Sequence, residues 1–372
     1  MVKEKVVVAM SGGVDSSVAA YLLVKAGYDV VGMTLKTWPK ELCDTTPKGQ
    51  TCCSAKDVDD ARRVADQLGI PHYLIEASVP FRENVVDYFV ETYAHGMTPN
   101  PCVVCNRKIK SGLLLEKAAK LGIEKFATGH YASIVWDKNT SRHAVRQAVD
   151  PDKDQSYVLF QLTQDQLGRL MMPMGDLSKS EVRKIAQEAG LAVADKPESM
   201  ELCFIPDGDT QGFLRARVPE AFVPGDIVDQ SGRVLGQHQG IAAYTVGQRK
   251  GLGIAHPKPL YVLEVDPASN RVIVGEEDEL KSETCFVREV RWMSIPDLTA
   301  PVDADVKIRY RTARVPARLT PTAEGVEVRF HQPVLGGVSP GQAAVFYQGD
   351  CVLGGGWIAK NDRQLNLKQV LG

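Results

Sequence analysis

The sequence predicts an α/β fold, in which a doubly wound parallel sheet is followed by a small β-rich linker domain and a C-terminal β-barrel. Strand and helix signals alternate through the first half, which is typical of a parallel sheet covered by helices on both faces. After about Gly208 the helical periodicity fades, and short alternating segments appear between turn residues. Because 372 residues exceed one ordinary core, we expect three domains, over 1–207, 208–280 and 281–372.

Runs of apolar residues place the elements of the first half. The β-branched run from Val6 to Met10 predicts a buried central strand. Pro99 and Pro101 exclude a helix between 96 and 101. Further strands are expected at 28–35, 72–75 and 125–128, and helices from about 14 to Gly27, from about 54 to Gly69, at 81–93, at about 106–121, and from a capping box of Ser178 and Glu181 to Gly190.

The second half reads as β-structure. Residues 229–232 and 267–270 have the composition of hairpin turns. Strands are expected at 302–311, 315–319, 326–330, 343–347 and 351–358.

Composition narrows the class of protein. There are 44 Lys and Arg residues against 46 Asp and Glu, for a net charge of −2. That balance does not exclude nucleic acid as a partner, because binding needs a basic face rather than a basic total. No uncharged apolar stretch approaches the ~18 residues of a membrane helix. Eight cysteines without a signal peptide do not suggest a secreted disulfide framework, and we expect a cytoplasmic protein.

The strongest motif is the segment Ser11 to Ser17, SGGVDSS, between the first strand and the first helix. Gly12 and Gly13 let the backbone approach a phosphate closely, and the helix N-terminus behind them offers unpaired N–H groups. It differs from a Walker loop, since no lysine follows the glycines to hold β- and γ-phosphates. The pattern resembles the pyrophosphate loop of N-type ATP pyrophosphatases, which adenylate a substrate. An ordinary glycine turn is the alternative.

Three cysteines are candidates for chemistry. Cys102 and Cys105 form a C-x-x-C pair at the start of a helix, where the thiol pKa falls, and Cys203 follows far along the chain. On spacing alone the pair is ambiguous between redox chemistry, half a metal site and no function. Burial or loop packing is expected for the other cysteines, Cys43, Cys52, Cys53, Cys285 and Cys351.

The order of motifs resembles the tRNA-specific 2-thiouridylase (MnmA/TrmU) family over nearly the whole length. The matching segments are SGGVDSS at 11–17, CCS at 52–54, DVDDARRVADQLGIP at 57–71, TPNP at 98–101, CN at 105–106, ATGHY at 127–131, DKDQSY at 152–157, GQRKGLG at 247–253, RYR at 309–311 and PGQ at 340–342. The resemblance implies an adenine nucleotide alpha hydrolase-like catalytic domain with its active site at the carboxyl edge of the sheet.

Members of that family replace the C2 oxygen of the wobble uridine of tRNA with sulfur. The resemblance implies ATP and Mg²⁺ as cofactors, tRNAs such as those for Lys, Glu and Gln as substrates, and a persulfide donor (a cysteine desulfurase or a sulfur relay protein) as partner. Cys203 would carry the persulfide sulfur, and Cys105 would release the product and leave a Cys105–Cys203 disulfide. ATP is expected to bind at Ala9, Met10, Ser11, Gly12, Gly13, Val14, Asp15, Ser16, Met33 and Gly129.

The same resemblance assigns residues to RNA. Asn100, Pro101 and Cys102 fall where the family contacts the target base. The tRNA-contact positions are His130, Lys153, Asp154, Gln155, Arg309, Tyr310 and Gln342, with Arg249 and Lys250 as further phosphate contacts. Each has a plainer alternative as a strand-end, turn or strand-surface residue.

One position departs from the best-known family pattern, because Cys102 stands where aspartate is usual. Three cysteines, Cys102, Cys105 and Cys203, could then hold a [4Fe–4S] cluster whose fourth iron binds sulfide. Two mechanisms therefore stay open, a persulfide relay and a cluster-borne sulfide. Both need Cys105 and Cys203 to meet above Gly12 and Gly13.

Two other functions compete with thiolation. An amidotransferase-type enzyme could use the same loop to adenylate a small molecule, but it would have no use for the cysteines. A nucleotide-binding protein without catalysis would leave both the cysteines and the β-rich half unexplained.

Overall fold

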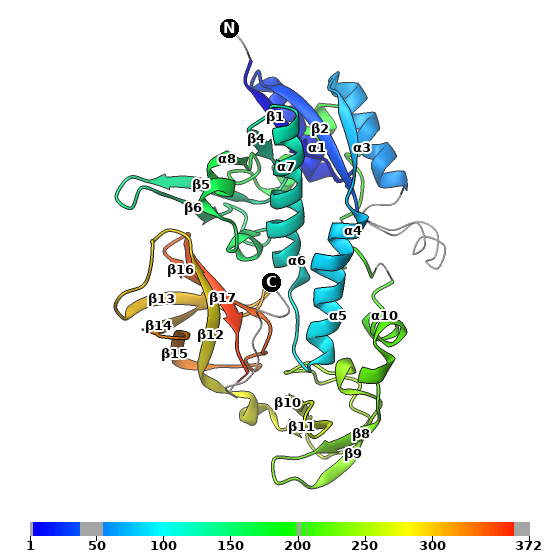
Figure 1. Ribbon diagram of the computed structural model, residues 1–372, viewed down its shortest axis with the longest axis vertical. Helices are drawn as coiled ribbons and strands as arrows, with labels where there is room; N and C mark the ends of the chain where they lie inside the picture. The colour runs from blue at the N-terminus through cyan, green and yellow to red at the C-terminus, as the bar shows by residue number, and fades with distance from the viewer. Residues whose placement is uncertain (1–2, 38–54, 199–201, 206, 361–372) are drawn as a thin grey trace.

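The computed structural model describes residues 3–37, 55–198, 202–205 and 207–360. The predicted loop around Cys43, Cys52 and Cys53 lies outside the described residues. Figure 1 shows an α/β domain, a β-rich domain at the opposite end of the molecule, and a β-barrel beside the long central helices.

A parallel sheet of five strands forms the first domain, in the order β3-β2-β1-β4-β7. Its strands are β1 (Lys5–Ala9), β2 (Asp29–Lys36), β3 (His72–Glu76), β4 (Lys125–Ala127) and β7 (Leu170–Met171). The strand β1 lies at the centre, and its valines Val6, Val7 and Val8 are fully buried. The predicted central strand and doubly wound fold are confirmed.

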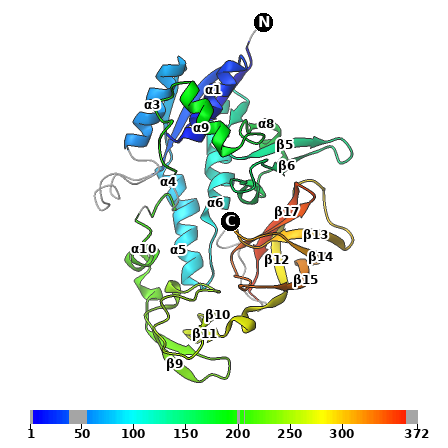
Figure 2. The same cartoon turned by 180° about the vertical axis from the view of Figure 1, so that it is seen from behind.

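Helices cover both faces of this sheet, as the views in Figures 1 and 2 show. Because side chains alternate along a strand, Val6 and Val8 pack with α1, α3 and α9, whereas Val7 packs in the cluster of α5 and α7. The helices are α1 (Val14–Lys25), α3 (Ala55–Leu68), α4 (Ser78–Phe81), α5 (Asp87–Ala94), α6 (Pro101–Val104), α7 (Leu114–Lys120), α8 (Gln164–Arg169) and α9 (Lys179–Glu188). π-Helical turns, Arg82–Val86 and Cys105–Leu113, join α4 to α5 and α6 to α7.

The first residues of two helices can be compared with the starts predicted from the sequence. The capping box of Ser178 and Glu181 is present at the start of α9, as predicted. The helix expected from about 106 begins earlier, at Pro101, because a proline fits the first helical position, where no N–H donor is needed. Asn100 caps that helix, its Oδ1 accepting a hydrogen bond from the N–H of Val103 over 3.4 Å.

The second domain contains a four-stranded sheet in the order β10-β11-β8-β9. Its strands are β8 (Gly225–Val228), β9 (Val234–His238), β10 (Tyr261–Asp266) and β11 (Arg271–Gly275). The predicted turns at 229–232 and 267–270 connect β8 to β9 and β10 to β11, so both predictions are confirmed. A helix that the sequence analysis missed, α10 (Thr210–Arg217), precedes this sheet.

The third domain is a closed barrel in the order β12-β15-β14-β13-β16-β17, with β12 also pairing with β17. The strands are β12 (Ser282–Trp292), β13 (Val302–Lys307), β14 (Val315–Thr322), β15 (Gly325–Val334), β16 (Ala343–Gln348) and β17 (Cys351–Ile358). The predicted barrel is confirmed, but β12 was missed and β13 ends four residues before the expected 311.

A hairpin of β5 (Ala132–Asp137) and β6 (Arg142–Gln147) links the first domain to this barrel. It was not predicted, and it projects from the first domain in Figure 1. The strand β6 pairs antiparallel with β17, with Arg146 opposite Cys351 in the register. The Nε of Arg142 donates a hydrogen bond to the carbonyl of Met293 over 2.8 Å. No described helix is both long enough and apolar enough to cross a lipid bilayer.

Candidate active site

The loop between β1 and α1 has a backbone that only glycine permits at its centre. Gly12 has a φ of +74°, and a Cβ there would lie 2.2 Å from the carbonyl oxygen of Asp57. The Oγ of Ser16 accepts a hydrogen bond from the N–H of Ser11 over 3.1 Å and donates to the carbonyl of Gly13 over 3.2 Å. The loop is therefore held in shape by its own hydroxyl groups before any ligand binds.

The N-terminus of α1 behind this loop has no side-chain cap, because its N-cap residue is Gly13. The first N–H groups of a helix lack intrahelical partners and carry about half a positive charge. An anionic group at this end would satisfy them. The geometry suits a phosphate bound across Gly12 and Gly13.

Neighbouring strands bring the other predicted nucleotide residues to the same edge. The N–H of Met10 donates to the carbonyl of Met33 over 2.8 Å. A Cβ on Gly129, which follows β4, would lie 2.6 Å from the backbone nitrogen of Ser16. Residues from three segments thus meet at the carboxyl end of β1, where open α/β sheets bind ligands.

Two lysines that the sequence analysis missed flank the loop. The Nζ of Lys179 donates to Asp15 Oδ1 over 2.6 Å. The Nζ of Lys196 donates to the carbonyl of Gly12 over 2.8 Å. These partners are 164 and 184 residues apart in the chain, and no spacing in the sequence signals either contact.

Glu198 forms ion pairs with two lysines beside the loop. Its carboxylate pairs with Lys153 at 2.8 Å and with Lys179 at 2.9 Å. Burial by itself raises the pKa of Glu198, but the hydrogen bonds and charges of these two lysines outweigh burial and lower the pKa to about 2. Glu198 is therefore ionised at neutral pH.

The three candidate cysteines differ in exposure. Cys105 is buried, at the start of the π-helical turn, and Cys203 is half-buried against the same apolar cluster. The following residue, Phe204, packs edge-on against Phe89 with ring centroids 5.1 Å apart. Both cysteines thus border one large apolar cluster, which extends from α5 to the barrel, and their meeting above Gly12 and Gly13 stays a prediction.

Cys102 is exposed, yet the surrounding protein raises the pKa of its thiol by desolvation, an effect that Lys110 partly offsets. Within the ranges that the structure describes, no three His, Cys, Asp or Glu side chains lie together so that they could hold a metal ion. In this arrangement Cys102, Cys105 and Cys203 do not form the ligand set of a cluster.

The turn that carries the predicted target-base residues is tied to the barrel. Asn100 is buried, and its N–H donates to the hydroxyl of Tyr88 over 3.3 Å. The side-chain amide of Gln342, in the turn before β16, donates to the carbonyl of Pro99 over 2.8 Å. Gln342 therefore holds residues 98–100, which we call the Asn100 turn. The exposed Cys102 follows two residues after Asn100.

His130 is buried next to the loop. Its Nδ1 lies 2.8 Å from the Oγ1 of Thr128. Burial, with a smaller contribution from Lys110, lowers the pKa of His130 to about 3. The imidazole is thus neutral at neutral pH, and any contact with RNA would be made by a neutral ring.

The residues after the hairpin use their side chains within the protein. Lys153 pairs with Glu198. Asp154 is buried and accepts hydrogen bonds from backbone N–H groups of the turn around it. The Oε1 of Gln155 accepts from the N–H of Tyr131 over 2.9 Å. Their roles as RNA contacts stay predictions.

Arg309 joins the second domain to the barrel. Its Nη2 donates to the carbonyls of Val246 and Gly336 over 3.0 Å and 2.9 Å. The next residue, Tyr310, is 39% exposed, and its ring lies 6.0 Å from that of Tyr157. Tyr310 is therefore the more accessible of the two predicted contacts. The further predicted phosphate contacts, Arg249 and Lys250, are exposed.

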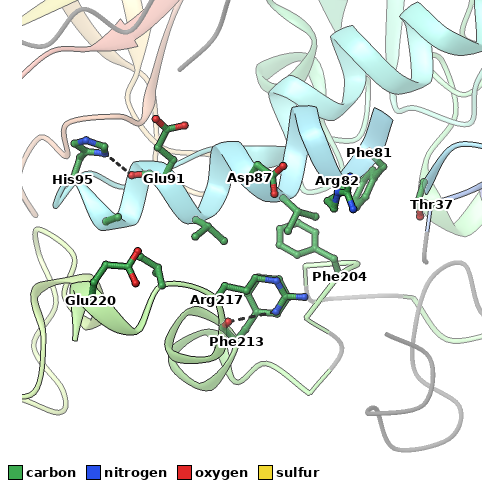
Figure 3. Close-up of a pocket in the computed structure, with 14 residues that line it drawn as sticks. Thr37, Phe81, Arg82, Asp87, Glu91, His95, Phe204, Phe213, Arg217 and Glu220 are labelled. Atoms are coloured by element: carbon green, nitrogen blue, oxygen red, sulfur yellow. Dashed lines mark hydrogen bonds between the residues drawn. The ribbon is translucent and has the colours of Figure 1, made fainter. Parts of the chain in front are cut away.

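A pocket of about 530 Å³ lies elsewhere, between α5 and α10 (Figure 3). Phe204 lines it between the helical segment that carries Arg82 and Asp87 and the segment that carries Arg217 and Glu220. None of the predicted site residues lines it. The pocket is therefore separate from the residues predicted to bind nucleotide and RNA.

Comparison with known proteins agrees with this arrangement. Three family models match in succession: tRNA methyl transferase HUP domain over residues 4–207, tRNA methyl transferase PRC-barrel domain over 211–276, and aminomethyltransferase beta-barrel domain over 282–358.

Two solved structures share little with the chain. An NMN synthetase from Francisella tularensis is 17% identical, with 59% of this chain and 74% of that chain covered and a TM-score of 0.33. A 4-thiouridine synthetase in complex with RNA and ATP is 16% identical, with 58% and 51% covered and a TM-score of 0.31. Scores this low carry no information about function.

Curated relatives match almost end to end. The tRNA-specific 2-thiouridylase MnmA of Heliobacterium modesticaldum is 48% identical, with 96% of this chain and 93% of the relative covered. The proteins of the same name from Geotalea uraniireducens and Moorella thermoacetica are 49% and 48% identical, with 96% and 94% of this chain and 95% and 98% of the relatives covered. At this identity and coverage, the chain belongs to the tRNA-specific 2-thiouridylase MnmA family of enzymes.

Proposed function

We propose that this protein adenylates the C2 oxygen of a wobble uridine in tRNA and replaces that oxygen with sulfur from a cysteine persulfide. A carbonyl oxygen is a poor leaving group, whereas AMP leaves readily. The observation that carries the proposal is the uncapped N-terminus of α1 behind the turn at Gly12 and Gly13, whose shape suits the pyrophosphate released by adenylation.

The nucleotide would bind where Met33 and Gly129 approach the loop. Asp15, in the first turn of α1, would hold Mg²⁺ through Oδ2, because its Oδ1 already accepts hydrogen bonds from Lys179 and Tyr131. Hard oxygen ligands suit that ion. Magnesium would neutralise phosphate charge during adenylation. Cys102 and the Asn100 turn would meet the uridine. Because this turn is hydrogen-bonded to Gln342 of the barrel, the base would enter between the first domain and the barrel.

Two thiols would complete the exchange. The terminal sulfur of a Cys203 persulfide attacks C2, the C2–O bond breaks, and AMP leaves with the bonding electrons. The Cys105 thiolate then attacks the Cys203 sulfur, so that the S–S bond to the base breaks and 2-thiouridine is released. The remaining Cys105–Cys203 disulfide must be reduced by cellular thiols, which fits a cytoplasmic enzyme. Cys105 and Cys203 both border one large apolar cluster, and this order requires the two sulfurs to approach each other.

One experiment tests the whole proposal. The protein is incubated with ATP, Mg²⁺, a persulfide donor and unmodified tRNA, and the nucleosides are analysed by mass spectrometry. We expect one uridine to exchange oxygen for sulfur, with AMP and pyrophosphate as products. Release of ADP, or no mass change in any nucleoside, would refute the proposal.

Matched variants separate the competing chemistries. Cys203→Ala should abolish thiolation, and Cys285→Ala, a buried barrel cysteine, serves as the control. An amidating enzyme would keep its activity in Cys203→Ala. For the cluster alternative, full thiolation by iron-free protein would exclude an iron–sulfur mechanism, whereas activity that requires iron would exclude the persulfide relay.

A further inference from the structure

Two lysines flank the pyrophosphate loop, and they differ in how many of their donors are used. An ammonium group has three N–H donors. Lys196 donates to the carbonyl of Gly12, to Asp57 Oδ1 and to Asp60 Oδ2, over 2.8 Å, 2.6 Å and 2.6 Å. All three of its donors are occupied by protein. Lys196 therefore holds the loop against α3.

Lys179 has a donor left. In the part of the chain that the structure describes, its Nζ contacts Asp15 Oδ1 at 2.6 Å and Glu198 Oε1 at 2.9 Å. The same ammonium lies 5.5 Å from the centroid of the Tyr131 ring, and the Tyr131 hydroxyl donates to Asp15 Oδ1 over 2.7 Å. Two carboxylates and a ring thus hold the charge while one N–H is available to a ligand.

The position of Lys179 is fixed by the fold. It is the first residue of α9, and α9 packs on α1 through Val182 and Ala186, which share a buried cluster with Val18. Its side chain is only 11% exposed. The ammonium therefore stands beside the first turn of α1, where the phosphates are expected.

We propose that Lys179 is a catalytic residue that stabilises the departing pyrophosphate, the task that a lysine within the loop performs in Walker-type sites. This inference rests on the proposed adenylation. The uracil O2 attacks the α-phosphorus, the bond from that phosphorus to the bridging oxygen breaks, and the electron pair leaves with pyrophosphate. The N3 proton of the base is lost to water. The leaving group gains one negative charge, which the third N–H of Lys179 meets.

The test compares binding of the two products in the intact enzyme. Inorganic pyrophosphate and AMP are used as product inhibitors of tRNA-dependent pyrophosphate release, with wild type, Lys179→Met, Lys179→Gln and Lys179→Arg. Lys184→Met is the control, because Lys184 is an exposed residue of the same helix. Thermal unfolding checks that each variant folds.

We expect Lys179→Met to lower kcat about 10²-fold, the typical cost of losing one charge-stabilising donor. Pyrophosphate inhibition should weaken about tenfold, while inhibition by AMP stays within about twofold. Lys179→Gln can still donate to Asp15 and Glu198 but has no charge, so it should resemble Lys179→Met. Lys179→Arg should recover part of kcat.

Other results would count against the proposal. Pyrophosphate inhibition that is unchanged in Lys179→Met, or that weakens equally with AMP inhibition, would overturn the role of Lys179. Full activity of Lys179→Gln would assign the residue a structural role. A wild-type enzyme that releases no pyrophosphate would instead refute the proposed function itself.

Discussion

The side-chain amide of Gln342 donates a hydrogen bond to the carbonyl of Pro99 over 2.8 Å, across 243 residues of chain. Gln342 also lies 3.4 Å from the carbonyl of Thr98 and 3.5 Å from the Nδ2 of Asn100. The barrel thus determines the shape of the turn before Cys102. A residue assigned to RNA binding by resemblance has a positioning role in the protein as well.

Replacing Gln342 with Leu should impair the Asn100 turn and leave the nucleotide site intact. The short hydrogen bond to Pro99 contributes about 1 kcal/mol, so we expect kcat/KM for tRNA to fall at least about fivefold. The dissociation constant for ATP should not change, since none of the hydrogen bonds that Gln342 makes with the described residues reaches the loop. Thiolation assays and ATP titrations provide the two measurements. Gln348→Leu, at the exposed end of β16, is the control, and an equal loss in that variant would contradict the prediction.

Gly129→Ala should strongly weaken ATP binding. The added Cβ would lie 2.6 Å from the backbone nitrogen of Ser16 and 2.7 Å from the carbonyl carbon of Asp15, so the start of α1 must shift. Equilibrium binding of ATP measures the effect, for which we expect at least about a 10²-fold loss, or about 2.7 kcal/mol. Gly236→Ala, where the nearest atom is a side-chain carbon of Ile254 at 3.4 Å, should bind ATP normally. Normal binding by Gly129→Ala would refute this account of the site.

His130 should make the protein less stable at acidic pH. Burial lowers the pKa of His130 in the folded state to about 3, whereas the unfolded chain titrates near the ordinary value of about 6.5. The unfolded state therefore binds the proton first as the pH falls. The contribution of neutral His130 to the free energy of unfolding is fully present above about pH 6.5, and below that pH it decreases by about 1.4 kcal/mol per pH unit.

Urea unfolding at pH 7.5 and pH 5.5, followed by circular dichroism, checks this expectation. We expect His130→Gln to lose less stability than wild type over that interval, because glutamine does not titrate. His256→Gln, an exposed histidine of the second domain, should behave like wild type. Parallel losses in wild type and His130→Gln would show that another group is responsible.

The thiol of Cys102 should react slowly with iodoacetamide at neutral pH, although the residue as a whole is exposed. The surrounding protein raises the pKa of this thiol, and Lys110 limits the rise. The thiolate is the reactive species, so alkylation should accelerate as the pH increases through 8 and 9. Lys110→Gln should raise the pKa further and slow alkylation at pH 8 a few-fold, as followed by peptide mass spectrometry. Lys120→Gln, on the exposed face of α7, is the control. Fast alkylation at pH 7 that is unaffected by Lys110→Gln would contradict the prediction.

Local patterns in the sequence determined the elements and the central motif. The valine run of β1, the paired glycines before α1 and the capping box of Ser178 act within a few residues of themselves, so they can be read without the rest of the chain. The same holds for the turns at 229–232 and 267–270. The family resemblance depends on such short motifs in a fixed order.

Only the tertiary structure decided which distant side chains meet. Lys179 reaches Asp15, and Gln342 reaches Pro99, because packing of α9 on α1 and closure of the barrel bring those segments together. The missed strands β5, β6 and β12 depend in the same way on cross-strand partners rather than on their own composition. Burial likewise decides the charge state of His130, since the pKa of a side chain depends on what surrounds it in space.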